Sequence, residues 1–213
     1  MNQSLDSIRL EYTLATLNEE DLDVSPFTQF KNWFQQALHA EITEVNAMTL
    51  STVDAEGQPH GRIVLLKGLE NNQFIFFTNY NSAKGKDIEY NAKVSLLFFW
   101  KELQRQVRIE GVLEKIPEQE STTYFQSRPR ESQLGAWASN QSEILHARNE
   151  LDERFEQLKA KYENKEIPKP AHWGGYALTA SKIEFWQGRA SRLHDRIVYV
   201  QHEGNWNKHR LNP

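Results

Sequence analysis

The chain has 213 residues, with 25 Lys and Arg against 29 Asp and Glu, which gives a formal net charge of −4. This slightly acidic balance argues against nucleic acid or an anionic membrane as the main partner, and the absence of cysteine excludes disulfides, thiolate metal sites and cysteine nucleophiles. No apolar run approaches membrane-spanning length and the N-terminus has no signal-peptide core, so we expect a cytoplasmic protein.

Residues 1–24 are polar, with only a weak helical pattern, and are predicted to form an N-terminal arm. Ser25 and Pro26 then provide a hydroxyl N-cap and a proline at the first helical position. Apolar side chains recur on one face up to about Glu41, as in an amphipathic helix. We therefore predict a helix here, at the start of a single domain that spans residues 25–213.

Short β-prone runs separated by turn sequences follow. The runs AMTLSTVD, RIVLLKGLE and QFIFFTN are predicted to form an antiparallel meander, KVSLLFFW and QVRIEGVLEKI a hairpin, and residues 173–213 a final set of strands. Helices are predicted after Ser82, after Pro117 and, as the longest, from Ser142 to about Asn164. This order indicates a mainly β, α+β protein built on a closed or split β-barrel, not on a parallel sheet.

Basic and hydroxyl side chains gather in several short segments, and each can be either a solvated basic turn or part of an anion site. Ser82 and Lys84 lie where the free amides at a helix N-terminus favour phosphate. Together the segments indicate one or two phosphorylated small-molecule ligands. The seven His lack metal-like spacing, so no metal is expected. The segments are RIVLLK (residues 62–67), NSAKGK (81–86), RQVR (105–108), YFQSRPRES (124–132) and RASRLHDR (189–196).

With FFTNYNSAKGK, YFQSRPRESQLGAWAS and above all EFWQGRASRLHDR, the chain resembles the pyridoxamine (pyridoxine) 5′-phosphate oxidase family from about residue 9 to the C-terminus. The resemblance implies an antiparallel, Greek-key FMN-binding split β-barrel with inserted and peripheral helices, completed by residues 173–213. It also implies a homodimer with FMN at the interface. Pyridoxamine or pyridoxine 5′-phosphate would be oxidised to pyridoxal 5′-phosphate and O2 reduced to H2O2, with a hydride passing from substrate C4′ to flavin N5.

The same resemblance assigns roles to residues of the matching motifs. Residues implied to bind FMN are Arg62, Ile63, Val64, Leu65, Leu66, Lys67, Phe77, Thr78, Ser82, Lys84, Gln106, Gln141, Ser142, Trp186 and Arg196. Residues implied to bind substrate are Lys67, Tyr124, Arg128, Ser132, Arg192, Leu193, His194, Arg9 and Tyr12. Of these, Arg192 and His194 are the implied catalytic residues, with a general-base role for His194 as a hypothesis.

Two positions depart from the family pattern. Ala83 stands where the family usually has Arg, which predicts weaker FMN binding, and Phe77 stands where the family often has Tyr. Arg189 has no assigned partner and is expected to be solvated. A non-catalytic carrier of flavin or pyridoxal phosphate and a nicotinamide-linked FMN reductase are the alternative functions. The paired substrate-phosphate and ring-binding residues favour the oxidase over both.

Overall fold

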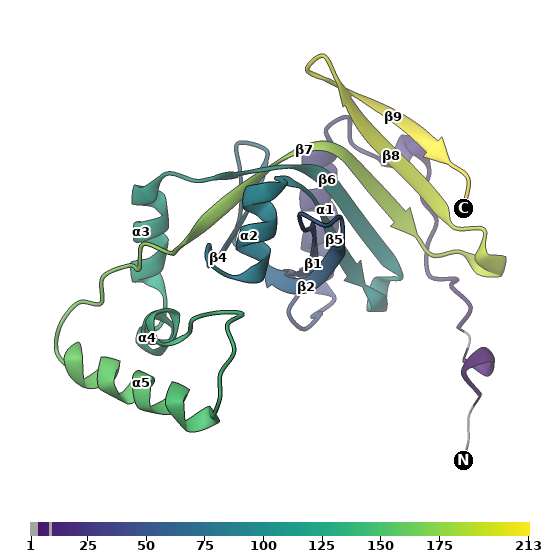
Figure 1. The fold of residues 1–213 in the computed structure, drawn as a ribbon. Helices are drawn as coiled ribbons and strands as arrows, with labels where there is room; N and C mark the ends of the chain where they lie inside the picture. The colour runs from purple at the N-terminus through teal and green to yellow at the C-terminus, as the bar shows by residue number, and fades with distance from the viewer. Residues whose placement is uncertain (1–3, 9) are drawn as a thin grey trace. The chain divides into compact units, whose positions relative to one another are not determined.

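The structure is a computed structural model, and it describes residues 4–8 and 10–213. Its α-helices and, apart from β3, its strands are labelled in Figure 1. The helices are α1 (Pro26–His39), α2 (Ala83–Tyr90), α3 (Glu118–Ser127), α4 (Arg130–Ala138) and α5 (Arg148–Lys161). The strands are β1 (Ala47–Val53), β2 (Pro59–Leu65), β3 (Gly68–Glu70), β4 (Gln73–Asn79), β5 (Lys93–Trp100), β6 (Arg105–Lys115), β7 (Trp173–Gln187), β8 (Asp195–His202) and β9 (Asn205–Leu211).

Hydrogen bonds join the strands in the order β2-β1-β5-β6-β7-β4-β3, with β8 paired to β7 and β9 paired to β8. The predicted β5–β6 hairpin is confirmed, but the predicted meander is wrong. RIVLLKGLE forms two strands: β2 pairs with β1, whereas β3 pairs with β4. The break falls at Leu66 and Lys67. Lys67 and Gly68 interrupt the apolar run near this point. Such an interruption does not show that the following strand pairs with a different partner, because strand order is not a local property of the sequence.

The chain divides into two compact units, which are described separately below. The first unit comprises Met1–Thr49, Ser95–Gly111 and Ala180–Pro213. The second unit comprises Leu50–Val94 and Val112–Thr179.

Aromatic packing fixes α1 within the first unit. Ser25 caps the helix by accepting a hydrogen bond from the Thr28 amide at 3.4 Å, and Pro26 opens its first turn. On the buried face, the rings of Phe30 and Phe98 meet edge to face with their centroids 5.2 Å apart. The predicted helix and its cap are therefore confirmed, with the end at His39.

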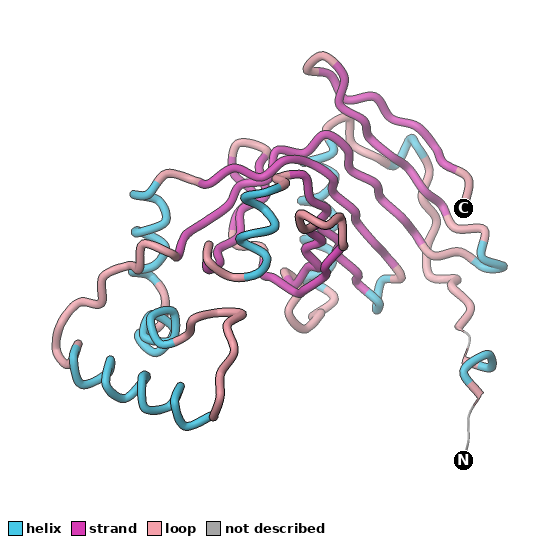
Figure 2. Tube along the Cα trace, viewed as in Figure 1, coloured by secondary structure: helices cyan, strands magenta, loops and turns pink. Residues whose placement is uncertain are grey.

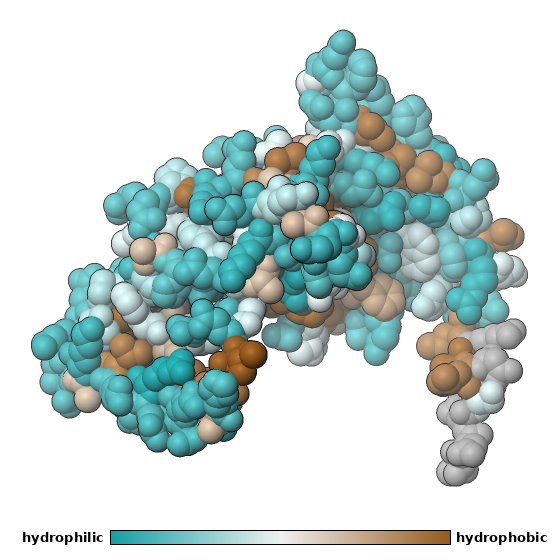
Figure 3. Space-filling view, in the orientation of Figure 1, coloured by the Kyte–Doolittle hydropathy of each residue, from teal (hydrophilic) through white to brown (hydrophobic). Residues whose placement is uncertain are grey.

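In the second unit, α3, α4 and α5 are joined by loops, and α4 packs on α5 (Figure 2). Their shared core consists of the buried residues Phe125, Leu134, Ile167 and Trp173. No residue of α5 is fully buried. In agreement with this exposure, the side chains of α5 that face the viewer in Figure 3 are mainly hydrophilic. This small helical layer lies beside the cavity described below.

The helix predicted from Ser142 to Asn164 is wrong at its start, because α5 begins at Arg148. Ser142 has a left-handed backbone with φ 75° and caps no helix, and Ile144 is 85% exposed. Ile144 continues the apolar spacing of α5 but has no core to pack against, so periodicity alone placed the boundary too early. The sequence prediction also missed α4, which lies between α3 and α5 in the chain.

Candidate active site

A cavity of about 630 Å³ lies in the second unit. The ends of β2 and β4, the start of α2 and the junction of α3 with α4 supply its walls. Eleven of the residues predicted to bind ligand line it together: Ile63, Val64, Leu65, Lys67, Phe77, Thr78, Lys84, Tyr124, Arg128, Ser132 and Gln141. Residues that the prediction did not include also line it: Asn79, Pro129, Gly135, Ala136, Ser139 and Trp173.

One basic group at this cavity is built around Lys84, on the first turn of α2. Its Nζ donates to Ser82 Oγ at 3.2 Å and to Gln141 Oε1 at 2.9 Å. Ser82 is also the N-cap of α2 and accepts from the Gly85 amide. Burial lowers the pKa of Lys84, and the nearby charge of Arg62 lowers it further. Two cations held together in a partly buried place favour an anion between them.

Arg62, on β2, is held in place by buried neighbours. Its guanidinium donates to Thr52 Oγ1 at 2.6 Å and to the Leu50 carbonyl at 3.1 Å, and it lies 3.6 Å from Asp87 Oδ2. Thr52 in turn donates to Asp87 at 2.6 Å. Asp87 is 7% exposed and belongs to α2, so α2 fixes the orientation of Arg62 as well as that of Lys84. The sequence pattern gave no signal for this role of Asp87.

A second basic group surrounds Arg128, at the junction between α3 and α4. The Arg128 guanidinium carbon lies 4.6 Å from the ring centroid of Trp173 and 5.6 Å from that of Phe125. Its NH1 is buried and makes no hydrogen bond within the described part of the chain. Burial lowers the pKa of Arg128. A buried, unpaired guanidinium nitrogen at a cavity wall is a ready partner for an incoming anion.

Flat aromatic rings form the wall next to Arg128. Phe77 stacks on Tyr124 with centroids 3.8 Å apart and on Trp173 with centroids 5.4 Å apart. A side chain at Gly175 would meet the Phe77 ring and Ile116, so glycine is required there by close packing. Phe77 therefore stacks on both of its aromatic neighbours in this wall.

The turn between β7 and β8 in the first unit carries the predicted catalytic residues. The His194 ring lies 4.5 Å from the Trp186 ring and 5.9 Å from the Tyr12 ring, measured between centroids. Arg192 and Leu193 are exposed in the same turn. The structure therefore brings Tyr12, Trp186 and His194 together, as a second cluster of predicted site residues.

The remaining predicted residues have other surroundings. Arg196 forms a bidentate ion pair with Glu184, donating from Nε at 2.9 Å and from NH2 at 3.1 Å. Gln106 is half-buried in β6 and Leu66 is buried, while Ser142 lies in the exposed loop before α5. Arg9 lies outside the described residues. Arg189, expected to be solvated, is 38% exposed at its side chain, and it also pairs with Asp195 at 2.7 Å, a contact that the sequence did not predict.

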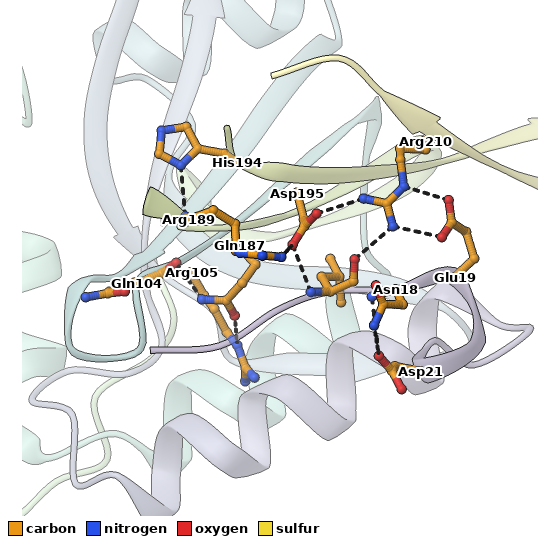
Figure 4. A network of polar contacts seen from close by, with 11 residues as sticks. Asn18, Glu19, Asp21, Gln104, Arg105, Gln187, Arg189, His194, Asp195 and Arg210 are labelled. Carbon is orange, nitrogen blue, oxygen red and sulfur yellow. Dashed lines mark hydrogen bonds and ion pairs between the residues drawn. The ribbon is translucent and has the colours of Figure 1, made fainter. Parts of the chain in front are cut away.

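Figure 4 shows a network that ties the N-terminal segment to β8 and β9. Arg210 pairs with Glu19 at 2.7 and 2.8 Å and with Asp195 at 2.8 Å. It also donates to the Leu17 carbonyl at 3.0 Å, while Asp195 accepts from the Leu17 amide at 3.0 Å. Leu17 itself is buried. The segment around residue 17 is thus held by charge-assisted hydrogen bonds on both sides.

This network predicts a specific acid sensitivity. The hydrogen bond from Arg210 lowers the pKa of Glu19 from 4.5 to about 2. Because the folded-state pKa is the lower one, the pair stabilises the fold fully above pH 4.5, and this contribution is lost as the pH falls toward 2. Urea unfolding followed across this range should show a steeper loss of stability for the wild type than for Arg210→Gln. Parallel pH profiles for the two proteins would contradict the prediction.

Within residues 4–8 and 10–213, no three His, Asp or Glu side chains come together to hold a metal ion. No helix of this part of the chain has both the length and the apolar character needed to cross a membrane.

The antiparallel β fold and the cavity define a class: a protein that binds a flat, phosphorylated ligand between basic groups and an aromatic wall. A family model described as pyridoxamine 5′-phosphate oxidase matches residues 34–162, and one described as pyridoxine 5′-phosphate oxidase C-terminal dimerisation region matches residues 173–213. The chain belongs to the pyridoxamine 5′-phosphate oxidase family.

Individual relatives agree with this assignment. The chain is 52% identical over 214 residues to a pyridoxine/pyridoxamine 5′-phosphate oxidase of Trichormus variabilis, covering 100% of both chains. It is 53% identical over 206 residues to one of Leptospira biflexa, covering 97% of each. A solved structure of PhzG from Burkholderia lata 383, in complex with tetrahydrophenazine-1-carboxylic acid, matches with a TM-score of 0.88 and 27% identity, covering 94% of this chain and 100% of that one. The predicted split β-barrel fold is thereby confirmed.

Proposed function

We propose that this chain is an FMN-dependent oxidase that converts pyridoxamine and pyridoxine 5′-phosphates to pyridoxal 5′-phosphate, with O2 reduced to H2O2. The observation that carries the proposal is the presence, at a single cavity, of two separate basic groups around Lys84 and Arg128. An oxidase of this kind needs two phosphate sites, one for the cofactor and one for the substrate. Relatives at 52% and 53% identity carry this activity in their names.

The residues present fit FMN. Lys84 and Arg62 provide a point charge and a guanidinium for the phosphate, next to the N-terminus of α2. The buried Ser82 hydroxyl donates to the Asn79 carbonyl at 2.7 Å and accepts from Lys84, so its role here is to hold Lys84 in place. The polar side chains of Thr78 and Gln141 and the strand around residues 63–65 offer hydrogen bonds and a surface for the flavin rings. When bound, FMN supplies a hydride acceptor and a route for the electrons to O2.

The substrate phosphate is assigned to the second basic group. Arg128 offers its unpaired NH1, Ser132 a hydroxyl, Lys67 an ammonium group and Tyr124 a phenol, and all four line the cavity. These phosphate contacts are remote from the reacting carbon, so their binding energy can fix the substrate ring for hydride transfer. Binding and orientation are therefore the main tasks of these side chains.

The other assignments are part of the proposal. Arg192, Leu193, His194 and Tyr12 orient the substrate ring, and Trp186, Gln106 and Arg196 contribute to flavin binding. Arg9 and Ser142 keep their predicted roles on the resemblance alone. A homodimer with FMN at the interface is supported by the match of residues 173–213 to a dimerisation region. The cytoplasmic location stays a prediction.

The Ala83 position offers a gain-of-affinity prediction. Ala83 is exposed at the first position of α2, directly before Lys84. In Ala83→Arg, a further guanidinium next to the proposed site of the FMN phosphate is expected to tighten FMN binding about tenfold, since a charge-assisted hydrogen bond contributes about 1.5–3 kcal/mol. Quenching of flavin fluorescence on binding measures this affinity. Ala83→Gln has a long polar side chain without the charge and is the control; equal affinities in all three proteins would refute the prediction.

The proposed function is tested with the full chain purified in the presence of FMN. A yellow flavin spectrum, together with equal formation of H2O2 and pyridoxal 5′-phosphate from pyridoxamine 5′-phosphate, is the expected result. Flavin binding without turnover would identify a non-catalytic carrier instead. A colourless protein that stays inactive with added FMN would overturn the proposal as a whole.

A further inference from the structure

The turn that carries Arg192 and His194 has a strained backbone. Ser191 and Arg192 both have left-handed conformations, with φ 56° and 63°. Two successive non-glycine residues rarely adopt this conformation, and such strain persists only where the surroundings hold it. Strained turns of this kind gather at functional sites, so the contacts that maintain this one are informative.

Contacts hold this turn at both ends and in the middle. Arg189, before the turn, pairs with Asp195, after it, through NH1 and Oδ2 at 2.7 Å (Figure 4). In the middle, the Ser191 amide donates to Glu11 Oε2 at 3.2 Å. Asp195 is 12% exposed at its side chain, and Arg210 occupies its other oxygen. The Arg189–Asp195 pair therefore closes the turn from within a partly buried setting.

The same arginine also contacts His194 through its backbone. The Arg189 amide donates to His194 Nδ1 at 3.1 Å. An N–H group can only donate, so Nδ1 must be the unprotonated nitrogen, and the proton of the neutral ring lies on Nε2. No hydrogen bond joins Nε2 to another residue of the described ranges. The turn therefore selects one tautomer and leaves its N–H for a ligand.

We propose that Arg189 is a positioning residue: its ion pair with Asp195 holds the turn so that His194 stays the Nε2–H tautomer and serves the substrate as a hydrogen-bond donor. A histidine held in this way is not a general base, because its basic nitrogen already accepts a hydrogen bond from the protein. The donor role rests on the proposed oxidase function, whereas the fixed tautomer does not.

The surroundings of His194 also keep its ring neutral. Burial lowers the pKa of His194, and the charge of Arg192 lowers it further. The other ionisable groups around the turn are Arg189 and Asp195, which neutralise each other, Glu11, which is held by the Ser191 amide, and the phenol of Tyr12. Protonation would also place a second N–H against the Arg189 amide. Each effect disfavours the imidazolium form.

The tautomer can be observed directly by ¹⁵N–¹H correlation spectra of the full chain labelled at histidine, with the His194 signals assigned by their loss in His194→Gln. The wild type should show the Nε2–H pattern at neutral pH. Arg189→Gln should show a mixture of tautomers and a higher titration midpoint for His194. Arg189→Lys, which keeps a cation for Asp195, should restore the wild-type pattern.

Arg210→Gln is the matched control, because it removes the partner of the other Asp195 oxygen and leaves Arg189 in place. It should keep the wild-type His194 pattern. An unchanged tautomer in Arg189→Gln, or equal changes in Arg189→Gln and Arg210→Gln, would overturn the proposal. These spectra need no turnover. They can therefore disprove the proposed role of Arg189 even if the oxidase function is correct, and support it even if the oxidase function is wrong.

The donor role is tested by the rate of flavin reduction by substrate. The amide of His194→Gln can still donate but cannot act as a base, whereas His194→Leu can do neither. We expect His194→Leu to be slower than His194→Gln by about tenfold, the contribution of one hydrogen bond. Equal and severe losses in both variants would instead identify His194 as a base.

Discussion

Replacing Arg128 with methionine is expected to raise the KM for pyridoxamine 5′-phosphate by about 10- to 100-fold, since hydrogen bonds from a charged donor contribute about 1.5–3 kcal/mol. The buried NH1 of Arg128 has no hydrogen-bond partner among the described residues, so its loss removes the proposed contact with the ligand and no hydrogen bond within this part of the chain. Methionine keeps much of the apolar contact with Trp173 and limits the loss of packing. Steady-state kinetics with a fixed excess of FMN measure the effect.

Pyridoxamine without its phosphate is the matching probe. If Arg128 binds the substrate phosphate, kcat/KM for this truncated substrate should be nearly the same in the wild type and in Arg128→Met. Arg148→Met, which removes an exposed arginine of α5 whose ion pair with Asp152 lies at the surface, controls for the change in net charge. Equal losses with both substrates would show that Arg128 acts on the fold and not on the phosphate.

Replacing Arg62 with methionine is expected to weaken FMN binding by about 100-fold. The change removes one partner of the proposed charge pair between Arg62 and the FMN phosphate, and truncating one member of such a pair costs about 2–5 kcal/mol. The change removes one of the two cations of the basic group around Lys84. It also removes the ion pair of Asp87, which is 7% exposed, and leaves this carboxylate the hydrogen bond from Thr52. Equilibrium titration with FMN gives the affinity, and urea unfolding without FMN gives the separate effect on stability.

Lys86→Met is the control for Arg62→Met. Lys86 is exposed on α2, and its loss changes the net charge by the same amount while leaving the Arg62–Asp87 ion pair intact. FMN affinity should stay close to wild type in this variant, apart from a small salt-dependent effect. If both variants weaken FMN equally, general electrostatic attraction rather than contact by Arg62 would explain the affinity.

Local signals in the sequence predicted the helices that begin with a clear N-capping residue. α1 follows from Ser25, Pro26 and its apolar face, and α2 follows from the Ser82 cap. α4 was missed because Arg130 and Ser132 looked like a polar turn, and its packing against α5 arises only in three dimensions. The division of RIVLLKGLE between two partners likewise depends on strand order, which no local pattern contains.

The cavity was largely predictable, because many of its residues lie in the short segments RIVLLK, NSAKGK and YFQSRPRES. Trp173 was missed as a wall residue since it stands 45 positions after Arg128, the group that it stacks on. Asp87 and Asp195 were missed for a related reason. Their importance lies in which arginine each one holds, and the pairs Arg62–Asp87 and Arg189–Asp195 depend on the folded backbone.

The contact of Arg128 with the rings of Trp173 and Phe125 affects the entropy of ligand binding. A free arginine side chain loses about 2 kcal/mol of rotamer freedom when it is ordered. Because Trp173 and Phe125 already confine the guanidinium, most of that loss belongs to folding and little of it to the arrival of a ligand. A lysine here would keep the charge but lose the planar stacking, so Arg128→Lys should bind phosphate with a larger entropic penalty, visible by calorimetry as a less favourable entropy at a similar enthalpy.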